Sequence, residues 1–236
     1  MKKVLIQEKL KEMGVELEDI NLGDFDAIGE YTAKKNRTRN SELYRKVGCF
    51  FRPNYERGIL LYYLTRKKEC ESVLEIGFGR GYGAFCIAKA MCDHGIDGKI
   101  TTVDPNFNED FLNQLSQVFP KEWFERIEFV QGTSDEYFKN NPEQSYDLIY
   151  IDGDHTYQAV KSDWENSKEK YNKLLLFDDY HLPTKKSGPE IQCADLIDTI
   201  EDETKELIIM DRRIFLDDRG YSDDQIDYGQ VLLTKV

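Results

Sequence analysis

The sequence predicts an α/β fold with a doubly wound, mostly parallel sheet that ends in an antiparallel hairpin. Beyond residue 71, short strand-like runs alternate with helical stretches, which is typical of right-handed βαβ units. Two of the runs, 148–151 and 174–177, are continuously apolar, as expected for strands that are covered on both faces. The last two runs follow each other without a helix between them, so they should pair antiparallel.

Seven strands make up the expected sheet, at 72–76, 99–103, 127–131, 146–151, 173–177, 206–210 and 230–234. Helices are expected between the first five strands, at 83–92, 109–118, 135–139 and 158–171. A further helix at 189–200 leads to the sixth strand, and a polar stretch separates the sixth strand from the seventh.

Residues 1–70 have a different pattern and are expected to form an N-terminal helical extension to the domain at 71–236. Spaced apolar residues predict an amphipathic first helix: Val4, Leu5, Leu10 and Met13. A polar segment at 31–40 follows, and another helix is expected over 55–66. The extension is either a solvated surface with a packing helix or a lid whose Lys and Arg residues meet an anionic substrate.

Composition narrows the class of partner. The chain carries 32 Lys and Arg against 45 Asp and Glu among its 236 residues, a formal net charge of −13. Such a surface repels phosphate backbones and anionic lipid, so a small-molecule substrate is expected rather than nucleic acid or a membrane. The five cysteines include no CxxC pair, which favours a reducing cytoplasm. No stretch approaches the roughly 20 apolar residues that span a membrane. A homo-oligomer is left open.

A glycine-rich turn follows the first expected strand and opens the next helix. Gly77, Gly79 and Gly81 have GxGxG spacing, and the acidic Glu75 precedes the first of them by two residues. Glycines at such a turn let the chain reverse sharply and let a ligand contact bare backbone. A dinucleotide-binding GxGxxG fingerprint would need glycine at position 82, where this chain has Tyr82. The turn therefore favours a different ligand.

This Glu-x-Gly-x-Gly-x-Gly pattern resembles the signature of class I S-adenosylmethionine-dependent methyltransferases, which have a Rossmann-like fold. In that family the turn contacts the methionine part of the cofactor, and an acid ending the second strand binds the ribose hydroxyls. Asp104 stands at that place. The segment after the third strand contacts adenine in the family. The resemblance implies these cofactor-binding residues: Glu75, Gly77, Gly79, Gly81, Asp104, Gly132, Thr133, Ser134 and Asp152.

Acidic residues end the fourth and fifth expected strands: Asp152 after the fourth, and Asp178 and Asp179 after the fifth. The carboxyl ends of neighbouring parallel strands line one crevice, so these side chains should converge. Three carboxylates cannot all stay ionised in a closed cleft without a counter-charge. A hard divalent cation such as magnesium would supply it. In the alternative, aspartates at strand ends cap helices or form turns and bind no metal.

The segment 151–157, Ile-Asp-Gly-Asp-His-Thr-Tyr, resembles the methyltransferase domain 24 group. More distantly it is similar to metal-dependent sugar O-methyltransferases and to catechol O-methyltransferase. The resemblance covers about 72–181 and implies a magnesium ion held by Asp152, Asp178 and Asp179. Such an ion would orient a substrate hydroxyl and lower its pKa.

A general base is also expected at this edge of the sheet, because a hydroxyl must lose its proton when it takes a methyl group. His181 and Asp154 are both candidates, each two positions past a predicted metal ligand. His181 is preferred because the ordinary pKa of histidine suits the task. His155 is expected to form a structural hydrogen bond or to open the following helix.

The favoured function is metal-assisted O-methylation of a small hydroxylated substrate, such as a sugar, with S-adenosylmethionine as methyl donor. A metal-free methyltransferase acting on nitrogen, protein or nucleic acid is the second hypothesis, although no Asn/Asp-Pro-Pro-Tyr/Phe motif is present. A non-catalytic cofactor-binding module is the third, and the intact glycine turn argues against it. We expect the basic run 34–39 and the loop 183–190 to determine substrate specificity.

Overall fold

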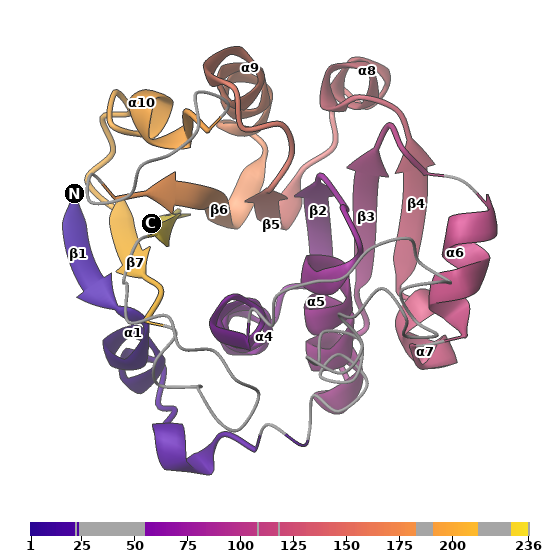
Figure 1. Cartoon of the computed structure of the whole chain (residues 1–236), viewed down its shortest axis with the longest axis horizontal. Helices are drawn as coiled ribbons and strands as arrows, with labels where there is room; N and C mark the ends of the chain where they lie inside the picture. Colours follow the sequence, from indigo (N-terminus) through magenta and orange to yellow (C-terminus); the bar gives the residue numbers. More distant parts are fainter. Residues whose placement is uncertain are drawn as a thin grey trace, which may run out of the picture.

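The computed structural model describes residues 1–21, 23, 55–107, 109–117, 119–182, 191–211 and 228–235. Within them an eight-stranded sheet runs in the order β1-β7-β8-β6-β5-β2-β3-β4 (Figure 1). Its strands are β1 (Lys2–Leu5), β2 (Ser72–Ile76), β3 (Lys99–Asp104), β4 (Ile127–Gln131), β5 (Tyr146–Ile151), β6 (Tyr171–His181), β7 (Glu206–Ile209) and β8 (Tyr228–Thr234). Every neighbouring pair is parallel except that β8 runs antiparallel to both β6 and β7. The predicted α/β fold with an antiparallel C-terminal hairpin is therefore confirmed.

Helices cover both faces of the sheet, as a doubly wound fold requires. One layer holds α8 (Ser134–Asn140), α9 (Tyr157–Ser167) and α10 (Cys193–Ile197), at the top of Figure 1. The other holds α1 (Ile6–Glu12), α4 (Tyr55–Lys68), α5 (Tyr82–Asp93), α6 (Glu109–Ser116) and α7 (Lys121–Phe124), with the short helix η1 (Leu17–Asp19) nearby. The core correspondingly consists of two hydrophobic clusters. One includes Leu196 of the first layer, and the other includes Phe85 of the second.

The N-terminal residues differ from the prediction. Lys2–Leu5 form strand β1, parallel to β7 at the edge of the sheet, and helix α1 begins only at Ile6. The expected first helix, which included Val4 and Leu5, is wrong at these positions. Val4 is buried, whereas Lys2 and Lys3 are exposed, so charged residues protect the sheet edge. A four-residue strand is too short for its apolar pattern to be told from a first helical turn.

The rest of the expected extension is described only in part. Helix α4 spans Tyr55–Lys68, close to the predicted 55–66, and it packs against α5. The polar segment 31–40, with its basic run 34–39, and the loop 183–190 lie outside the described residues. None of the helices in the described ranges is long and apolar enough to cross a membrane.

Strand β6 contains an irregularity that matters for the site. Its register with β8 shifts between Phe177 and Tyr180, and Asp179 has a φ of +48° in the left-handed region. Irregularities of this kind re-aim side chains at the end of a strand. Asp178 is consequently buried at 2% exposure, whereas Asp179 lines a cleft beside it.

Candidate active site

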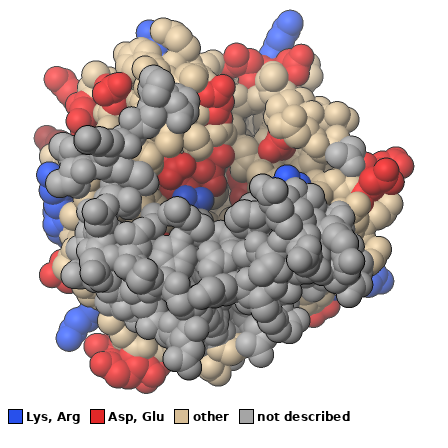
Figure 2. All heavy atoms as spheres, in the orientation of Figure 1, with Lys and Arg blue, Asp and Glu red and all other residues tan. Residues whose placement is uncertain are grey.

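A cleft of about 790 Å³ opens beyond the carboxyl ends of β2 to β6, and its volume is in the range of cofactor pockets. This is where open α/β sheets bind ligands. The cleft is lined by most residues that the sequence assigns to the cofactor: Gly77, Gly79, Asp104, Gly132, Thr133, Ser134 and Asp152. Among the described residues, four predicted site residues do not line it: Glu75, Gly81, Asp178 and His181. Figure 2 shows acidic side chains gathered around a basic one in the middle of this face.

The glycine turn between β2 and α5 is fixed by close backbone contacts. Gly77 has a φ of +86°, and a Cβ added there would lie 2.2 Å from the carbonyl oxygen of Asp152. At Gly79, with a φ of +53°, an added Cβ would meet no atom within 4 Å, because this residue borders the open cleft. Gly81, with a φ of +89°, is the N-cap of α5. The turn therefore presents bare backbone to the cleft.

Asp104 ends β3, and its carboxylate is joined to the glycine turn. Its Oδ2 accepts hydrogen bonds from the amides of Phe78 and Gly79, both at 3.1 Å, and its Oδ1 accepts one from the amide of Asn106 at 2.8 Å. These bonds hold the carboxylate at the wall of the cleft. A carboxylate has about four acceptor positions, so it keeps capacity for a ligand hydroxyl. Ribose binding by Asp104 fits this position and stays a prediction.

Glu75 lies behind the turn. Its side chain is 1% exposed, and its Oε2 accepts a hydrogen bond from the Thr102 hydroxyl at 2.7 Å. The amide of Ala84, in the first turn of α5, is a second donor. Burial raises the pKa of Glu75 to about 8. In this arrangement Glu75 joins β2, β3 and α5 and supports the turn from behind.

The segment after β4 forms another wall of the cleft. Thr133 is the N-cap of α8, where its hydroxyl accepts the amide of Glu136 at 3.3 Å and the Glu136 carboxylate accepts the amide of Thr133 at 3.1 Å. The Ser134 hydroxyl donates to the carboxylate of Asp163. Asp163 is 4% exposed and lines the cleft, and burial raises its pKa to about 6. No sequence pattern marks Asp163 as a site residue, because an acid inside a helix carries no signal that it lines a cleft.

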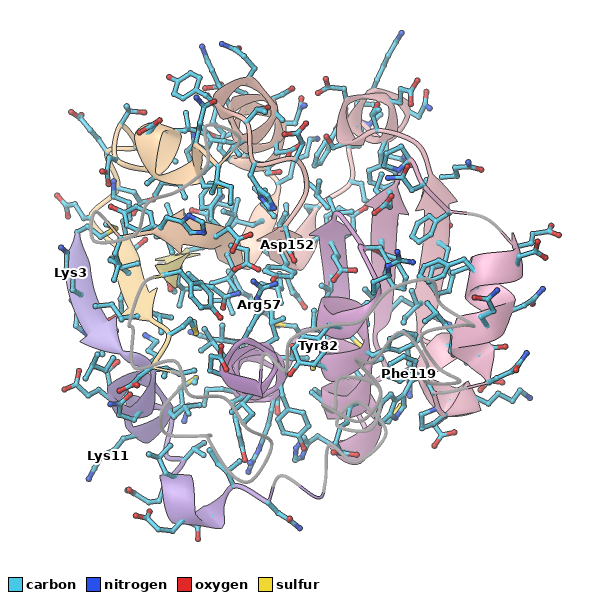
Figure 3. The ribbon with its side chains drawn as sticks, in the orientation of Figure 1. Lys3, Lys11, Arg57, Tyr82, Phe119 and Asp152 are labelled. Atoms are coloured by element: carbon cyan, nitrogen blue, oxygen red, sulfur yellow. The ribbon has the colours of Figure 1, made fainter. Side chains whose placement is uncertain are left out.

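At the ends of β5 and β6 the acidic residues surround Arg57, which comes from α4 (Figure 3). Arg57 Nη1 lies 2.8 Å from Asp178 Oδ2 and 3.4 Å from Asp152 Oδ2, and Nη2 lies 3.5 Å from Asp179 Oδ1. The Tyr150 hydroxyl donates to Asp178 Oδ2 at 2.6 Å. The three carboxylates thus converge as the sequence predicts, but they converge on an arginine.

Arg57 compensates the charges of this cluster in part. Burial opposes the charge of Arg57, but the neighbouring carboxylates, Asp178 foremost, outweigh it and hold the guanidinium pKa well above its ordinary value. Burial, followed by the charge of Asp178, raises the pKa of Asp152 well above its ordinary value. Arg57 therefore supplies one positive charge where a divalent cation is predicted, and the raised pKa of Asp152 shows that this charge does not compensate all three carboxylates.

The cluster does not fit a magnesium ion held by all three aspartates. Both oxygens of Asp178 are engaged, because Oδ2 faces Arg57 and Tyr150 and Oδ1 accepts the amide of Asp179 at 2.7 Å. One group of described side chains could offer ligand atoms within 4.8 Å of one another, namely Asp152, His155 and Asp179. It includes a ring nitrogen, whereas magnesium favours oxygen. A cation placed beside Arg57 would also be repelled by the guanidinium.

The candidate bases occupy different positions. Asp154 is exposed and lines the cleft, and its carboxylate accepts a backbone amide at the start of α9 at 2.8 Å. His181 is 9% exposed and lies behind Asp179, with its Nε2 3.9 Å from Asp179 Oδ1. His155 lines the cleft, and its Nε2 is 3.3 Å from Asp179 Oδ2. Of the two histidines at this edge, His155 is the one that reaches the cleft.

Comparison with known proteins agrees with the glycine-turn assignment. Residues 74–180 match the family model of methyltransferase domain 24, described as "Methyltransferase domain". A curated Mycobacterium sp. (strain JLS) protein named "Putative O-methyltransferase" is 29% identical over 97 residues, which cover 41% of this chain and 43% of that relative. A Mycobacterium avium (strain 104) protein of the same name is 29% identical over 99 residues, covering 41% and 42%. The match therefore spans less than half the length of these curated relatives.

Solved structures share the fold over nearly the whole chain. The O-methyltransferase from Bacillus cereus, in complex with SAH, has a TM-score of 0.59 at 13% identity and covers 98% of this chain and 97% of its own. TomG from Streptomyces achromogenes, an O-methyltransferase involved in tomaymycin synthesis and solved with SAM, has a TM-score of 0.56 at 14% identity and covers 92% and 97%. The fold is thus that of the Rossmann-like methyltransferases. Within it, residues 74–180 are the part that matches the methyltransferase family model.

Proposed function

We propose that this protein is an S-adenosylmethionine-dependent O-methyltransferase that acts on a small hydroxylated molecule. The observation that carries the proposal is the single cleft in which the glycine turn, Asp104 and the segment 132–134 meet. The family-model match and the curated relatives named as O-methyltransferases support the same reaction class. Bound S-adenosylmethionine would supply a methyl group activated by a sulfonium, and an acidic cleft favours such a cationic ligand.

The residues of the cleft divide between cofactor and acceptor. At one end, the backbone of Gly77 and Gly79 and the carboxylate of Asp104 would hold the cofactor. At the other end, the acceptor hydroxyl must give up a proton as its oxygen takes the methyl group. We propose that the pair formed by His155 and Asp179 accepts this proton. His155 reaches the cleft, and its ring lies within hydrogen-bond distance of the Asp179 carboxylate.

Two other features of the acceptor end belong to the proposal. Asp154 also lines the cleft and is the alternative base. Carboxylates and a guanidinium are suitable hydrogen-bond partners for hydroxyl groups, so a sugar is among the acceptors that we propose. Metal-assisted transfer, with magnesium at Asp152 and Asp179, is the competing mechanism.

Cofactor binding tests the central claim. Thermal unfolding of the full chain should shift upward with S-adenosylmethionine or S-adenosylhomocysteine and should not shift with NAD⁺. A ligand at about 100 times its Kd stabilises the folded state by about 2.7 kcal/mol. Asp104→Ala should lose the shift, whereas Asp97→Ala, at a fully exposed acid paired with Arg126, should keep it. The proposal fails if the wild-type chain shows no shift with either cofactor.

Transfer of a labelled methyl group then tests the acceptor class. The wild-type chain should label members of a panel of small sugars and phenols, and it should not label poly-lysine or nucleic acid. Each reaction is run with EDTA and with added Mg²⁺. Labelling that needs Mg²⁺ would favour the metal-assisted mechanism. Labelling only of amines or polymers would replace the O-methyl proposal with a different acceptor.

A further inference from the structure

Arg57 connects the region before the methyltransferase domain to the acceptor end of the cleft. Its guanidinium contacts Asp178, Asp152 and Asp179, the three residues that the sequence analysis assigns to a metal. We propose that Arg57 takes the place of a divalent cation in this cluster, so that the site binds no magnesium and, resting on the function proposed above, transfers methyl groups without it. Arg57 thereby sets the charge and the positions of the side chains that face the acceptor.

Helix α4, which carries Arg57, is held in place by the neighbouring residue Glu56. Glu56 is 2% exposed, and its Oε1 accepts a hydrogen bond from the Tyr228 hydroxyl on β8 at 2.7 Å. The ring centroid of Tyr228 lies 6.0 Å from Arg57 Cζ, at the outer limit of a cation–π contact. Helix α4 also packs along α5, the helix that follows the glycine turn. Contacts of helix α4 thus fix the backbone of Arg57, and the carboxylates hold its guanidinium.

Tyr150 extends this arrangement into the sheet. Its hydroxyl donates to Asp178 Oδ2 at 2.6 Å and lies 3.2 Å from Asp152 Oδ2, and the Gln230 amide from β8 lies 3.4 Å from it. Tyr150 and Gln230 are both fully buried. Asp178 is therefore committed to side-chain donors from α4 and β5, and Gln230 of β8 supports Tyr150 from behind. An ion would have to displace these donors before it could use Asp178 as a ligand.

A guanidinium supplies only part of what a magnesium ion supplies. It brings one positive charge and directional N–H donors, and it has no coordination positions for two substrate oxygens. Chelation of neighbouring hydroxyls is therefore not available at this site. The proton of the acceptor must leave through a protein side chain, which agrees with the pair of His155 and Asp179 facing the cleft.

Mn²⁺ binding to the purified full chain, followed by electron paramagnetic resonance, tests the proposal without cofactor or substrate. Wild type should leave the free Mn²⁺ signal unchanged. Arg57→Met removes the charge and keeps the length, so it should bind Mn²⁺ at least about tenfold more tightly, because the repulsion is gone. Arg57→Lys keeps a charge and should show no gain. Arg126→Met is the matched control, because Arg126 forms its ion pair with the exposed Asp97 and donates to the Gly98 carbonyl, away from the cluster.

The outcomes are separable. A gain by Arg57→Met that Asp179→Asn removes, together with a rise of its Tm in Mn²⁺, supports the proposal. Tight Mn²⁺ binding by wild type that Asp152→Asn abolishes overturns it, as does a folded Arg57→Met that binds no Mn²⁺. If Arg57→Met does not fold, the wild-type measurement and Arg57→Lys decide. Because no S-adenosylmethionine is present, failure of the methyltransferase proposal leaves these results intact.

Discussion

The two ends of the cleft, which we propose bind the cofactor and the acceptor, hold their carboxylates by different means. At the cofactor end, Asp104 is bound by backbone amides, including those of Phe78 and Gly79 in the glycine turn. At the acceptor end, Asp178 is bound by the side chains of Arg57 and Tyr150. A backbone amide donates whatever side chain the residue carries, whereas a side-chain donor is lost when its residue is replaced. The cofactor end should therefore be sensitive to added bulk and the acceptor end to changed charge.

The largest effect on cofactor binding should come from bulk at the cofactor end. In Gly77→Ala the added Cβ would lie 2.2 Å from the carbonyl oxygen of Asp152, and the φ of +86° is strained for alanine. Overpacking of this kind costs about 1–3 kcal/mol of stability, and the displaced turn should weaken cofactor binding by at least about 100-fold. Isothermal titration with S-adenosylhomocysteine and chemical unfolding measure the two losses.

Gly95→Ala is the matched control for this substitution. Gly95 also has a positive φ, of +63°, but an added Cβ there would meet nothing within 4 Å, and the residue is not part of the described cleft lining. The control should lose about 1 kcal/mol of stability from backbone strain and keep its cofactor affinity. Equal cofactor affinity in both variants would show that the close approach of the turn to β5 does not shape the site.

At the acceptor end, the comparison between His155 and His181 is the next test. His155→Gln should lower kcat by about 100- to 1,000-fold with little change in cofactor Kd, because it removes the proton acceptor in the cleft. His181→Gln should cost less, since His181 is not among the described lining residues. Single-turnover methyl transfer measured across pH separates loss of a base from loss of binding. A greater loss in His181→Gln would restore His181 as the base.

The cofactor end could be predicted because its parts are close in the chain or fixed by topology. Gly77, Gly79 and Gly81 form one short pattern, and Asp104 ends β3, which pairs with β2 in parallel. Each of these positions depends on the backbone. The parallel part of the sheet and the antiparallel ending were predictable from the order of elements, since parallel strands are joined through a helix and the last two strands are not.

The acceptor end was predictable only in part. The sequence places Asp152, Asp178 and Asp179 at neighbouring strand ends and requires a counter-charge, but it cannot say which group provides it. Arg57 lies 95 positions before Asp152, and no spacing links the two residues. The irregularity at Asp179 likewise depends on the pairing of β6 with β8. This irregularity affects which histidine reaches the cleft. The sequence spacing of His181, two positions past Asp179, could not reveal it.

The smallest effect on turnover should come from substitution of Glu75. This substitution tests whether Glu75 supports the glycine turn or contacts the cofactor. Burial raises its pKa from 4.5 to about 8, so between these values the folded state keeps a proton that the unfolded state has lost. The free energy of unfolding should therefore fall as pH rises from about 4.5 to 8, by an amount on the order of a few kcal/mol, and then level off. Glu75→Gln should show a smaller decline, because the raised pKa values of Asp163 and Asp152 still contribute, and urea unfolding at several pH values measures it. Glu125→Gln, at a largely exposed acid, should decline as wild type does. Cofactor affinity of Glu75→Gln within a few-fold of wild type would keep Glu75 behind the turn, whereas a loss as large as that of Gly77→Ala would place it in the cofactor site itself.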